Sequence, residues 1–213
     1  MIMRTHRGQV NTLPIPLLSL TNQDYDGDDV SVRIFLTNTD PETYSETEFM
    51  TGAVRDTNSR AGYEAVTISM AKDRPVERAY GYDVTDVILG DLLAADYCTH
   101  FMVTNGDNFY SSSWLGTILP YINDNKELIA WDFLSHHPRD YNFISVKFER
   151  KFVDLGSVLF ARRAVDRTGA RFLPSGILTD DMFARDWWFF KTLKEGAPNS
   201  SVSTIHQVLY AHQ

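Results

Sequence analysis

The sequence is poor in cysteine and has no long apolar run. It holds 1 cysteine, Cys98, among 213 residues, so no intramolecular disulfide can form. A lone cysteine fits a reducing compartment, and we therefore expect a cytoplasmic protein. No stretch approaches the roughly 18 apolar residues of a membrane-spanning helix. The apolar stretch 13–20 is interrupted by Pro14 and Pro16 and lacks a signal-peptide cleavage site, so we expect neither a targeting segment nor a membrane span.

Basic residues are also scarce. The chain has 20 Lys and Arg against 28 Asp and Glu, a formal net charge of −8, and its basic residues do not run beyond pairs such as Arg162-Arg163. Binding to a phosphate backbone needs clustered basic residues, so we expect no nucleic-acid partner. Hydrophobic residues at 43% and charged residues at 23% are typical of a globular protein, which at this length buries about 70% of its unfolded surface.

The sequence lacks internal repeats, low-complexity tracts and linkers rich in Gly, Ser or Pro. We therefore expect residues 1–213 to form a single domain. The chain stops at Ala211-His212-Gln213, directly after an expected strand and without a polar tail. For this reason we expect the domain to be the N-terminal part of a longer protein.

Hydrophobic patterns predict strands and helices in alternation. Strands are expected at residues 30–36, 65–70, 99–104, 126–134, 143–148, 157–162 and 204–212. Helices are expected at residues 13–22, with Thr12 as N-cap, at 84–95, from about residue 112, and at 180–193. A short helix is also expected after Pro41, followed by a loop at residues 56–62. This order indicates an α/β fold with a central, mostly parallel, partly mixed sheet flanked by helices. Ligands of such sheets bind at the carboxyl ends of the strands.

A polar turn, Asn105-Gly106-Asp107-Asn108, directly follows the expected strand at 99–104. A carboxylate at that place could hold a divalent cation that bridges phosphate oxygens, and Asp107 is the candidate. The alternative is an ordinary turn, because Asn, Gly and Asp are the commonest turn residues.

Segments along most of the chain, in order, resemble the GT-A class of nucleotide-sugar glycosyltransferases. The segments that carry the resemblance are Met3–Arg7, Leu17–Tyr25, Val32–Asp40 and Asn105–Asp107. The resemblance implies a GT-A-like, Rossmann-like fold, and a UDP-sugar donor held at the ends of the first strands. The residues that it assigns to the donor nucleotide are Thr5, Arg7, Asn38, Asp40, Asn105 and Asp107.

The turn at Asn105–Asp107 falls where this family carries its Asp-x-Asp signature (DXD motif), which binds manganese or magnesium and the donor diphosphate. Asn105 replaces the first Asp and supplies no charge, so Asp107 is the expected ligand. The family often adds a histidine from its last strand, which makes His212, and after it His206, the further metal candidates. Six residues apart on an alternating strand, they would face the same side; the alternative is that they are solvated or core residues.

Two later segments complete the expected site by resemblance. Asp154–Ser157 resembles the loop that borders the donor sugar, which adds Asp154 and Gly156 to the site. The segment Leu178–Met182 resembles the acidic helix start that faces the acceptor, so Asp180 or Asp181 could be the base of an inverting transfer. The alternative is that Asp at a helix start only caps the helix, and a retaining enzyme would not need the base. Trp131 or Trp187 could stack on a sugar ring.

The sequence therefore predicts a metal-dependent glycosyltransferase that moves a hexose or deoxyhexose, glucose or rhamnose, from a UDP-sugar to a glycan acceptor. More narrowly, the chain is similar to N-terminal glycosyltransferase domains of chlorella-virus (chlorovirus) proteins of capsid glycan synthesis, which implies capsid protein glycosylation in the host cytoplasm. A sugar-phosphate nucleotidyltransferase is the first alternative, although Thr5–Gly8 is too sparse in glycine for its phosphate loop. The second alternative is a non-catalytic nucleotide-sugar or carbohydrate-binding domain, which Asn105 in place of Asp leaves open.

Overall fold

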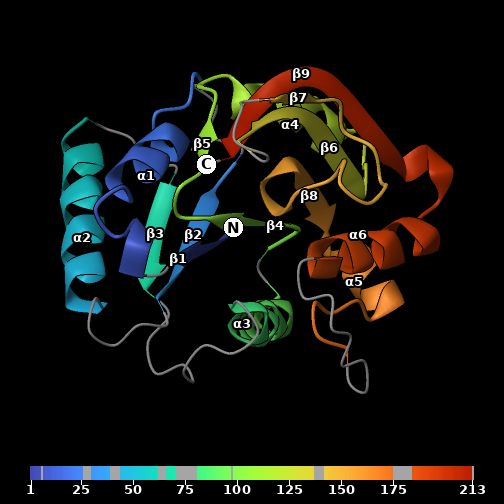
Figure 1. Ribbon diagram of the computed structural model, residues 1–213, viewed down its shortest axis with the longest axis horizontal. Coiled ribbons are helices and arrows are strands. Elements are labelled where there is room, and N and C mark those ends of the chain that lie inside the picture. Colours follow the sequence, from blue (N-terminus) through green and yellow to red (C-terminus); the bar gives the residue numbers. More distant parts are fainter. Residues whose placement is uncertain are drawn as a thin grey trace.

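The computed structural model describes residues 1–5, 7–25, 30–38, 44–61, 66–70, 81–96, 98–136, 142–174 and 184–212 (Figure 1). Its strands are β1 Ile2–Thr5, β2 Val32–Asn38, β3 Val66–Met70, β4 His100–Asn105, β5 Phe109–Tyr110, β6 Leu128–Ser135, β7 Asn142–Ile144, β8 Val158–Ala161 and β9 Val202–His212. Its helices are α1 Pro14–Thr21, α2 Tyr44–Ala61, α3 Tyr82–Ala95, α4 Trp114–Asn123, α5 Arg162–Thr168 and α6 Arg185–Gly196, with short 3-10 turns η1 Arg7–Gln9, η3 Leu155–Ser157 and η5 Asn199–Ser201.

The strands form a mixed sheet in the order β3-β2-β1-β4-β8-β6-β9-β5, with β7 paired to β6. Strands β3, β2, β1 and β4 are parallel to one another. Beyond them β8 runs antiparallel to both β4 and β6, and β9 runs parallel to β6. The predicted α/β fold with a mixed central sheet is confirmed. Because β1, β2 and β4 are parallel, they all end at one edge of the sheet.

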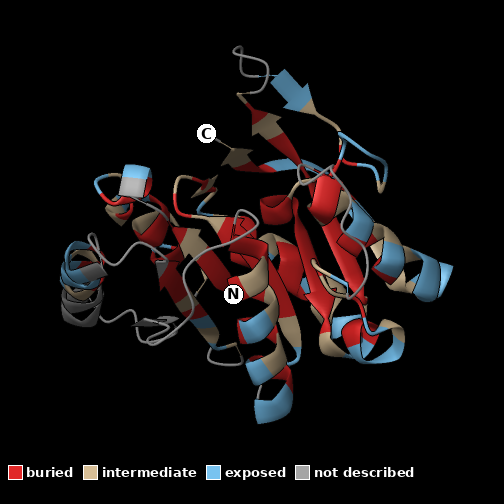
Figure 2. Ribbon diagram, turned by 60° about the horizontal axis from the view of Figure 1, so that its bottom comes forward, coloured by how far each residue is buried: buried red, intermediate tan, exposed pale blue. Residues whose placement is uncertain are grey.

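Helices cover both faces of this sheet, because successive side chains of a strand point to opposite faces. The sheet separates two apolar clusters. On β1, Ile2 belongs to the first cluster and Met3 to the second, and on β4, Phe101 belongs to the first and Met102 to the second. One cluster packs under α3, α5 and α6, and the other under α1, α2 and α4. Figure 2 shows the buried residues running along the strands between these helices. The central strands are therefore buried on both sides, and ligands can reach the sheet only at its edges.

The second helix is longer than the sequence indicates. A short helix and a loop at 56–62 were expected, but α2 continues to Ala61, so the predicted loop is wrong for residues 56–61. The buried stripe of α2 contains Thr47, Thr51 and Val54, at helical spacing of four and three. Threonines in two of these positions hide the apolar periodicity on which a helix prediction rests. The hydroxyl of Thr51 is satisfied inside the helix, since it donates to the carbonyl of Thr47 at 2.8 Å.

Helix α1 begins without the predicted cap. Leu13 occupies the N-cap position, and Thr12 instead donates its hydroxyl to the carbonyl of Gln9 at 3.0 Å. The N–H groups of Thr12 and Leu13 also bond Gln9, so the turn that follows η1 uses the threonine and leads directly into the helix. The N-cap prediction for Thr12 is therefore wrong, although the helix itself lies where it was expected.

The expected strands at 143–148 and 157–162 are shorter in the structure. Strand β7 ends at Ile144, and the N–H of Val146 donates to the side chain of Asp132 at 2.8 Å instead of to a neighbouring strand. Strand β8 ends at Ala161, because Arg162 is the first residue of α5.

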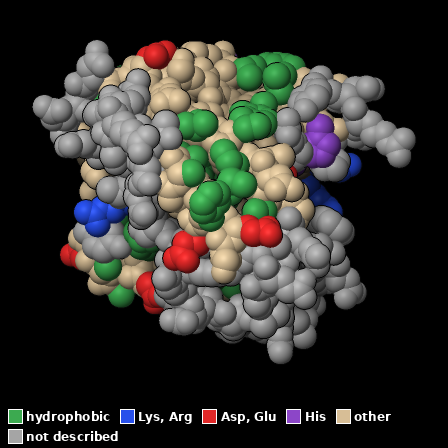
Figure 3. Space-filling view, turned by 90° about the vertical axis from the view of Figure 1, so that its left-hand side faces the viewer, with side chains coloured by type: hydrophobic (Ala, Val, Ile, Leu, Met, Phe, Trp, Pro, Cys, Tyr) green, Lys and Arg blue, Asp and Glu red, His purple; other side chains and the backbone are tan. Residues whose placement is uncertain are grey.

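Apolar side chains gather in the middle of the face seen from the left-hand side of Figure 1 (Figure 3). Among the described residues, Ile15 on α1 and Phe49 on α2 are exposed large apolar side chains, at 53% and 72% of their surface. Helices α1 and α2 pack against each other and still leave apolar surface outside. In the part of the chain that the structure describes, no helix is both long and apolar enough to cross a membrane.

Candidate functional site

The ends of β1, β2 and β4 bring several of the predicted site residues together. Thr5 pairs with Asn38 across β1 and β2, and Arg4 pairs with Asn105 across β1 and β4. The hydroxyl of Thr5, which is buried, donates to the carbonyl of Thr37. Segments that are far apart in the sequence therefore meet at the carboxyl edge of the parallel strands, where ligands of α/β sheets bind.

The turn after β4 is packed directly against β1. The N–H of Gly106 donates to the carbonyl of Arg4 at 2.7 Å. A Cβ at position 106 would lie 2.6 Å from Cγ2 of Thr5, which is closer than carbon atoms can approach. A larger residue would therefore require the side chain of Thr5 or the turn itself to shift. The close packing fixes the turn, and with it the backbone of Asp107.

Asp107 and Asn108 have different surroundings in this turn. Asn108 is fully buried, and its amide donates to Oγ1 of Thr104 at 3.0 Å, which also accepts the hydroxyl of Tyr110 at 2.7 Å. Oδ1 of Asp107 is also buried, and in the described part of the chain neither it nor Oδ1 of Asn108 has a hydrogen-bond partner. A buried carboxylate oxygen without a donor is costly. A bound cation would remove that cost, so Asp107 has the property expected of a metal ligand.

Asp154 is held in place by the loop η3 and by β9. Its Oδ1 accepts hydrogen bonds from the N–H of Gly156 at 3.0 Å and from the hydroxyl of Tyr210 at 2.7 Å. Ser157 closes the loop, because its Oγ accepts the N–H of Asp154 at 3.0 Å and donates to the carbonyl of Asp154. The carboxylate therefore has a defined orientation.

Gly156 fits beneath two tyrosines. A Cβ there would lie 2.5 Å from the ring of Tyr210 and 2.8 Å from the hydroxyl of Tyr110. The carbonyl of Gly156 also accepts that hydroxyl at 3.3 Å. The packing of the tyrosines explains by itself why position 156 is a glycine. Burial and the charge of Asp154 raise the pKa of both tyrosines well above the usual value, so both hydroxyls stay protonated and act as donors.

The two candidate histidines of β9 contact different carboxylates. Nδ1 of His212 lies 3.8 Å from Oδ2 of Asp154, and its ring is stacked on Tyr210. Nδ1 of His206 lies 3.5 Å from Oδ2 of Asp132, on a largely exposed side chain. The pairing of β9 with β6 shifts register around Asp132, and this breaks the simple alternation that predicted one shared face. The described residues contain no group of three or more His, Cys, Asp or Glu that could hold a metal ion.

A further carboxyl group, Asp186, lies near Asp154 and was missed in the sequence. It is the second residue of α6, and its Oδ1 accepts the N–H of Trp187 at 2.7 Å. Burial, followed by the charge of Asp154, raises the pKa of Asp186 to about 7, while Arg4 acts in the opposite direction. The carboxyl thus exchanges its proton near neutral pH. The sequence signal was only the pattern Arg185-Asp186-Trp187, which is equally typical of an ordinary helix start.

Arg4 and Tyr82 border the same carboxyl. The guanidinium of Arg4 lies over the ring of Tyr82, 4.6 Å from its centre. Burial, followed by the charge of Asp186, raises the pKa of Tyr82 to about 12. Nε and Nη1 of Arg4 are buried without a hydrogen-bond partner among the described residues. Arg4 therefore has donors left for an anionic group at the strand edge, next to Asp186.

Several predicted site residues have no described side chain, and the sugar-stacking role predicted for Trp131 is wrong. Asp40, Asp180 and Asp181 lie outside the described residues, and of Arg7 and Asn38 only the backbone is described. Trp131 is fully buried in the core, so the prediction that it stacks on a sugar is wrong. It lies on a central strand covered on both sides, which the sequence pattern alone did not reveal. Trp187 is half-buried beside Trp188 and Lys191.

Comparison with known proteins gives a fold and no close relative. No family model and no curated protein matches the chain. Among solved structures, Staphylococcus aureus TarS matches with a TM-score of 0.67 at 12% identity, over 100% of this chain and 36% of TarS. TarS is a glycosyltransferase with a GT-A-like fold. The fold of this chain is GT-A-like.

Two further structures contain residues 1–349 of TarS with ligands. The complex with UDP has a TM-score of 0.67 at 9% identity, and the complex with UDP-GlcNAc has a TM-score of 0.64 at 9% identity. Both match over 100% of this chain and over 60% and 58% of those chains. The chain therefore spans a little over a third of TarS and less than two thirds of its 1–349 fragment. At such low identity the likeness establishes the GT-A-like fold, and residue roles must be argued from this chain itself.

Proposed function

We propose that this chain is a nucleotide-sugar glycosyltransferase domain that uses a UDP-sugar donor. The observation that carries the proposal is the buried, unpartnered Oδ1 of Asp107 at the carboxyl edge of a GT-A-like sheet. That edge also presents the spare donors of Arg4, which suit the negative charge of a diphosphate. Solved TarS structures with the same fold hold UDP and UDP-GlcNAc, which supports a uridine nucleotide as the ligand.

Asp107 is the residue that would hold a manganese or magnesium ion. Such ions take one or two protein carboxylates and complete their shell with water and substrate phosphates, so one aspartate suffices to begin a site. His212 is the next candidate ligand, because Nδ1 of its ring lies 3.8 Å from Oδ2 of Asp154 and the ring is stacked on Tyr210. Asn105 could bind a ribose hydroxyl through its amide. When bound, the metal stabilises the charge that develops on the departing diphosphate.

The remaining chemistry is a proton transfer to a carboxylate. In an inverting transfer the base takes the proton of the acceptor hydroxyl as the hydroxyl attacks the anomeric carbon. We propose Asp180 or Asp181 for this base and place Asp154 beside the donor sugar, oriented by Tyr210 and Gly156. Thr5, Arg7, Asn38 and Asp40 remain the proposed contacts of the nucleotide.

The substrates are proposed from the resemblance. A hexose or deoxyhexose, glucose or rhamnose, would be moved to a glycan on a viral capsid protein, in the host cytoplasm. We also propose that residues 1–213 form a single domain. A non-catalytic binding domain is the second candidate function, because Asn105 removes one charge from the metal site.

Release of UDP from a panel of UDP-sugars, with manganese, magnesium or chelator, tests the proposal. The panel includes UDP-glucose, UDP-rhamnose and UDP-GlcNAc. Metal-dependent release from one sugar supports the transferase, and its acceptor can then be sought. Binding of UDP-sugars without any release would favour the binding domain. Absence of both release and binding would contradict the proposed function.

A further inference from the structure

Arg4 is fixed through its backbone at the edge of the sheet where the donor is proposed to bind. It pairs with Thr37 on β2 and with Asn105 on β4. Its carbonyl accepts the N–H of Gly106, in the turn that carries Asp107. The side chain is half-buried, and it has several rotatable bonds that the strand does not fix. A binding role for the guanidinium therefore requires a second contact that holds it.

Tyr82 supplies that contact. Cζ of Arg4 lies 4.6 Å from the centre of the Tyr82 ring, within the range of a cation–π interaction. Nε and Nη1 of Arg4 have no hydrogen-bond partner among the described residues, so these nitrogens do not fix the guanidinium. Arg4 follows Ile2 by two residues on β1 and shares its face of the sheet. Ile2 and Tyr82 belong to the same apolar cluster, which brings Arg4 to the ring.

The ring of Tyr82 is itself held by the core. Tyr82 is the first residue of α3 and is 7% exposed. Its ring stacks on Phe172 with the ring centres 5.5 Å apart, and Phe172 stacks on Phe189 of α6 with the centres 4.0 Å apart. Both phenylalanines are buried. The guanidinium of Arg4 therefore lies on a ring that cannot move without disturbing the packing of α3 against α6.

The charges around Tyr82 favour a cation on its ring. Burial, followed by the charge of Asp186, raises the pKa of Tyr82 to about 12, so the hydroxyl stays protonated and the ring is uncharged at pH 7. The negative face of an uncharged ring attracts a guanidinium. Asp186 is the weaker support for Arg4, because burial and the charge of Asp154 raise its pKa to about 7 and a protonated carboxyl group carries no charge.

We propose that Tyr82 is a positioning residue that holds the guanidinium of Arg4 ready for the diphosphate of the UDP-sugar. The inference rests on the proposed function, because it takes a diphosphate as the ligand of Arg4. A side chain that is held before the ligand arrives has less rotamer freedom to lose on binding, and this raises the affinity. Tyr82 therefore strengthens binding of the diphosphate through Arg4.

A double-mutant cycle on UDP binding tests the inference. Isothermal titration with UDP and manganese compares the parent protein with Tyr82→Leu, with Arg4→Gln and with the double variant. Tyr82→Leu should weaken UDP binding about fivefold, the effect of one cation–π contact. In the Arg4→Gln background it should have no further effect, whereas a merely structural role would weaken binding in both backgrounds. Tyr82→Phe keeps the ring and should bind UDP nearly as the parent does.

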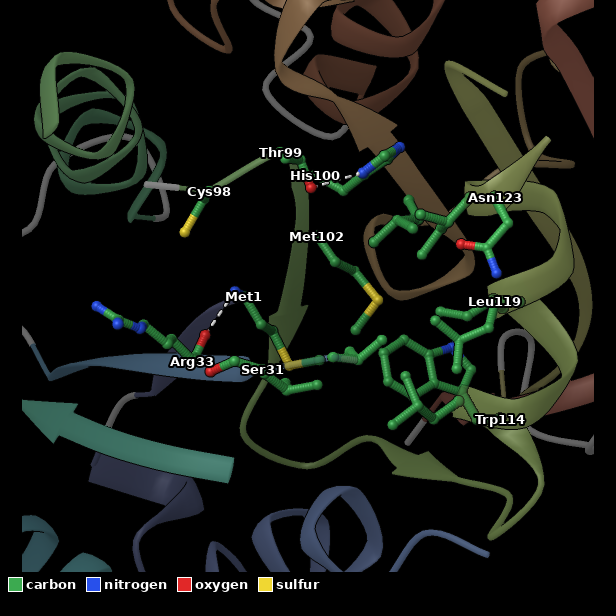
Figure 4. Close-up of a pocket in the computed structure, with 16 residues that line it drawn as sticks. Met1, Ser31, Arg33, Cys98, Thr99, His100, Met102, Trp114, Leu119 and Asn123 are labelled. Carbon is green, nitrogen blue, oxygen red and sulfur yellow. Dashed lines mark hydrogen bonds between the residues drawn. The ribbon is translucent and has the colours of Figure 1, made fainter. Parts of the chain in front are cut away.

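Arg33 on β2 provides the matched control for Arg4. It lines a cavity of about 330 Å³ at the opposite edge of the sheet, where β1, β2 and β4 begin (Figure 4). Arg33→Gln removes the same charge from the protein and should leave the affinity for UDP unchanged. An equal loss of affinity in Arg33→Gln and in Arg4→Gln would show that only the net charge matters, and would overturn the inference.

Ring fluorination decides the question if Tyr82→Leu does not fold, as judged by circular dichroism. Tyr82→Phe and the same variant with a fully fluorinated ring have nearly the same shape, but fluorine removes the negative charge from the ring face that attracts a cation. The affinity for UDP should be about fivefold lower with the fluorinated ring, and this difference should be absent in the Arg4→Gln background.

Two results would overturn the inference and leave the proposed function intact. One is equal affinity for UDP with the plain and the fluorinated ring, and the other is an equal effect of Tyr82→Leu with and without Arg4. A parent protein that does not bind UDP would contradict the proposed function, and the inference with it.

Discussion

The hydroxyl of Tyr210 donates a 2.7 Å hydrogen bond to Oδ1 of Asp154, and this bond ties the last strand to the loop before β8. Tyr210 is 1% exposed, and its ring packs against Tyr110 and Phe133. The same residue therefore belongs to the core through its ring and to the acidic site through its oxygen. This relationship explains why the site depends on packing far along the chain.

Replacing Tyr210 with phenylalanine should affect activity and stability separately. The ring contacts remain, and Asp154 loses one of its two donors to Oδ1, which should cost about 1–3 kcal/mol of unfolding free energy. UDP release should fall about tenfold because Asp154 is less well oriented. Urea unfolding and UDP release measure the two effects. Tyr121→Phe on α4 is the matched control, and an equal loss of activity in that variant would contradict the role given to Tyr210.

Gly106→Ala should destabilise the protein by about 1–3 kcal/mol, because its Cβ would meet Cγ2 of Thr5 at 2.6 Å. Thr5→Ser removes that methyl group and keeps the hydroxyl that bonds Thr37. The double variant should therefore recover most of the stability lost in Gly106→Ala. Chemical denaturation of the single and double variants gives the coupling free energy between positions 5 and 106.

Gly90→Ala on α3 is the control for the Gly106 series. Nothing lies within 4 Å of the added Cβ, so it should raise stability by about 0.5–1 kcal/mol. Full additivity of Thr5→Ser and Gly106→Ala would refute the packing account.

Asp186 should make stability fall as the pH rises from about 4 to about 7. Burial raises its folded-state pKa to about 7, so the folded state keeps a proton that the unfolded state has already lost. The unfolded state then binds fewer protons, and the unfolding free energy decreases with pH over this window, by about 4 kcal/mol at most.

Asp186→Asn removes this titration and can still accept the N–H of Trp187. The stability of the variant relative to the parent, measured by urea unfolding, should therefore rise as the pH goes from about 4 to about 7 and stay constant above that. Taking the difference between the two proteins cancels the titration of the other carboxyl groups. A difference that does not change with pH would show that Asp186 titrates at its ordinary pKa.

The sequence predicted most strands and helices, because apolar periodicity is clear where one face is buried. It failed at α2, where Thr47 and Thr51 stand in the buried stripe, and at Thr12, whose hydroxyl is used by the preceding turn. These failures arise from side-chain hydrogen bonds, which composition and spacing do not record.

The site was predictable only in part. Asp107 lies in a polar turn directly after a strand, which is a visible signal, whereas Asp154 was predicted only from the family resemblance. In the sequence, Asp186 has the pattern of a helix start and Tyr210 that of a core strand. Their position beside Asp154 follows from the order of the strands in the sheet. That order is set by contacts between distant segments and cannot be read from local patterns.

The affinity for UDP, with and without manganese, tests the central claim about Asp107 most directly. Isothermal titration of the parent protein is compared with Asp107→Asn, and with Asp124→Asn at the exposed end of α4 as the control. We predict that manganese tightens UDP binding at least about tenfold, or about 1.4 kcal/mol, in the parent and in the control, because the carboxylate of Asp107 would hold the cation beside the diphosphate, and that it has no effect in Asp107→Asn. An equal effect of manganese in all three proteins would contradict the assignment of Asp107 as the metal ligand.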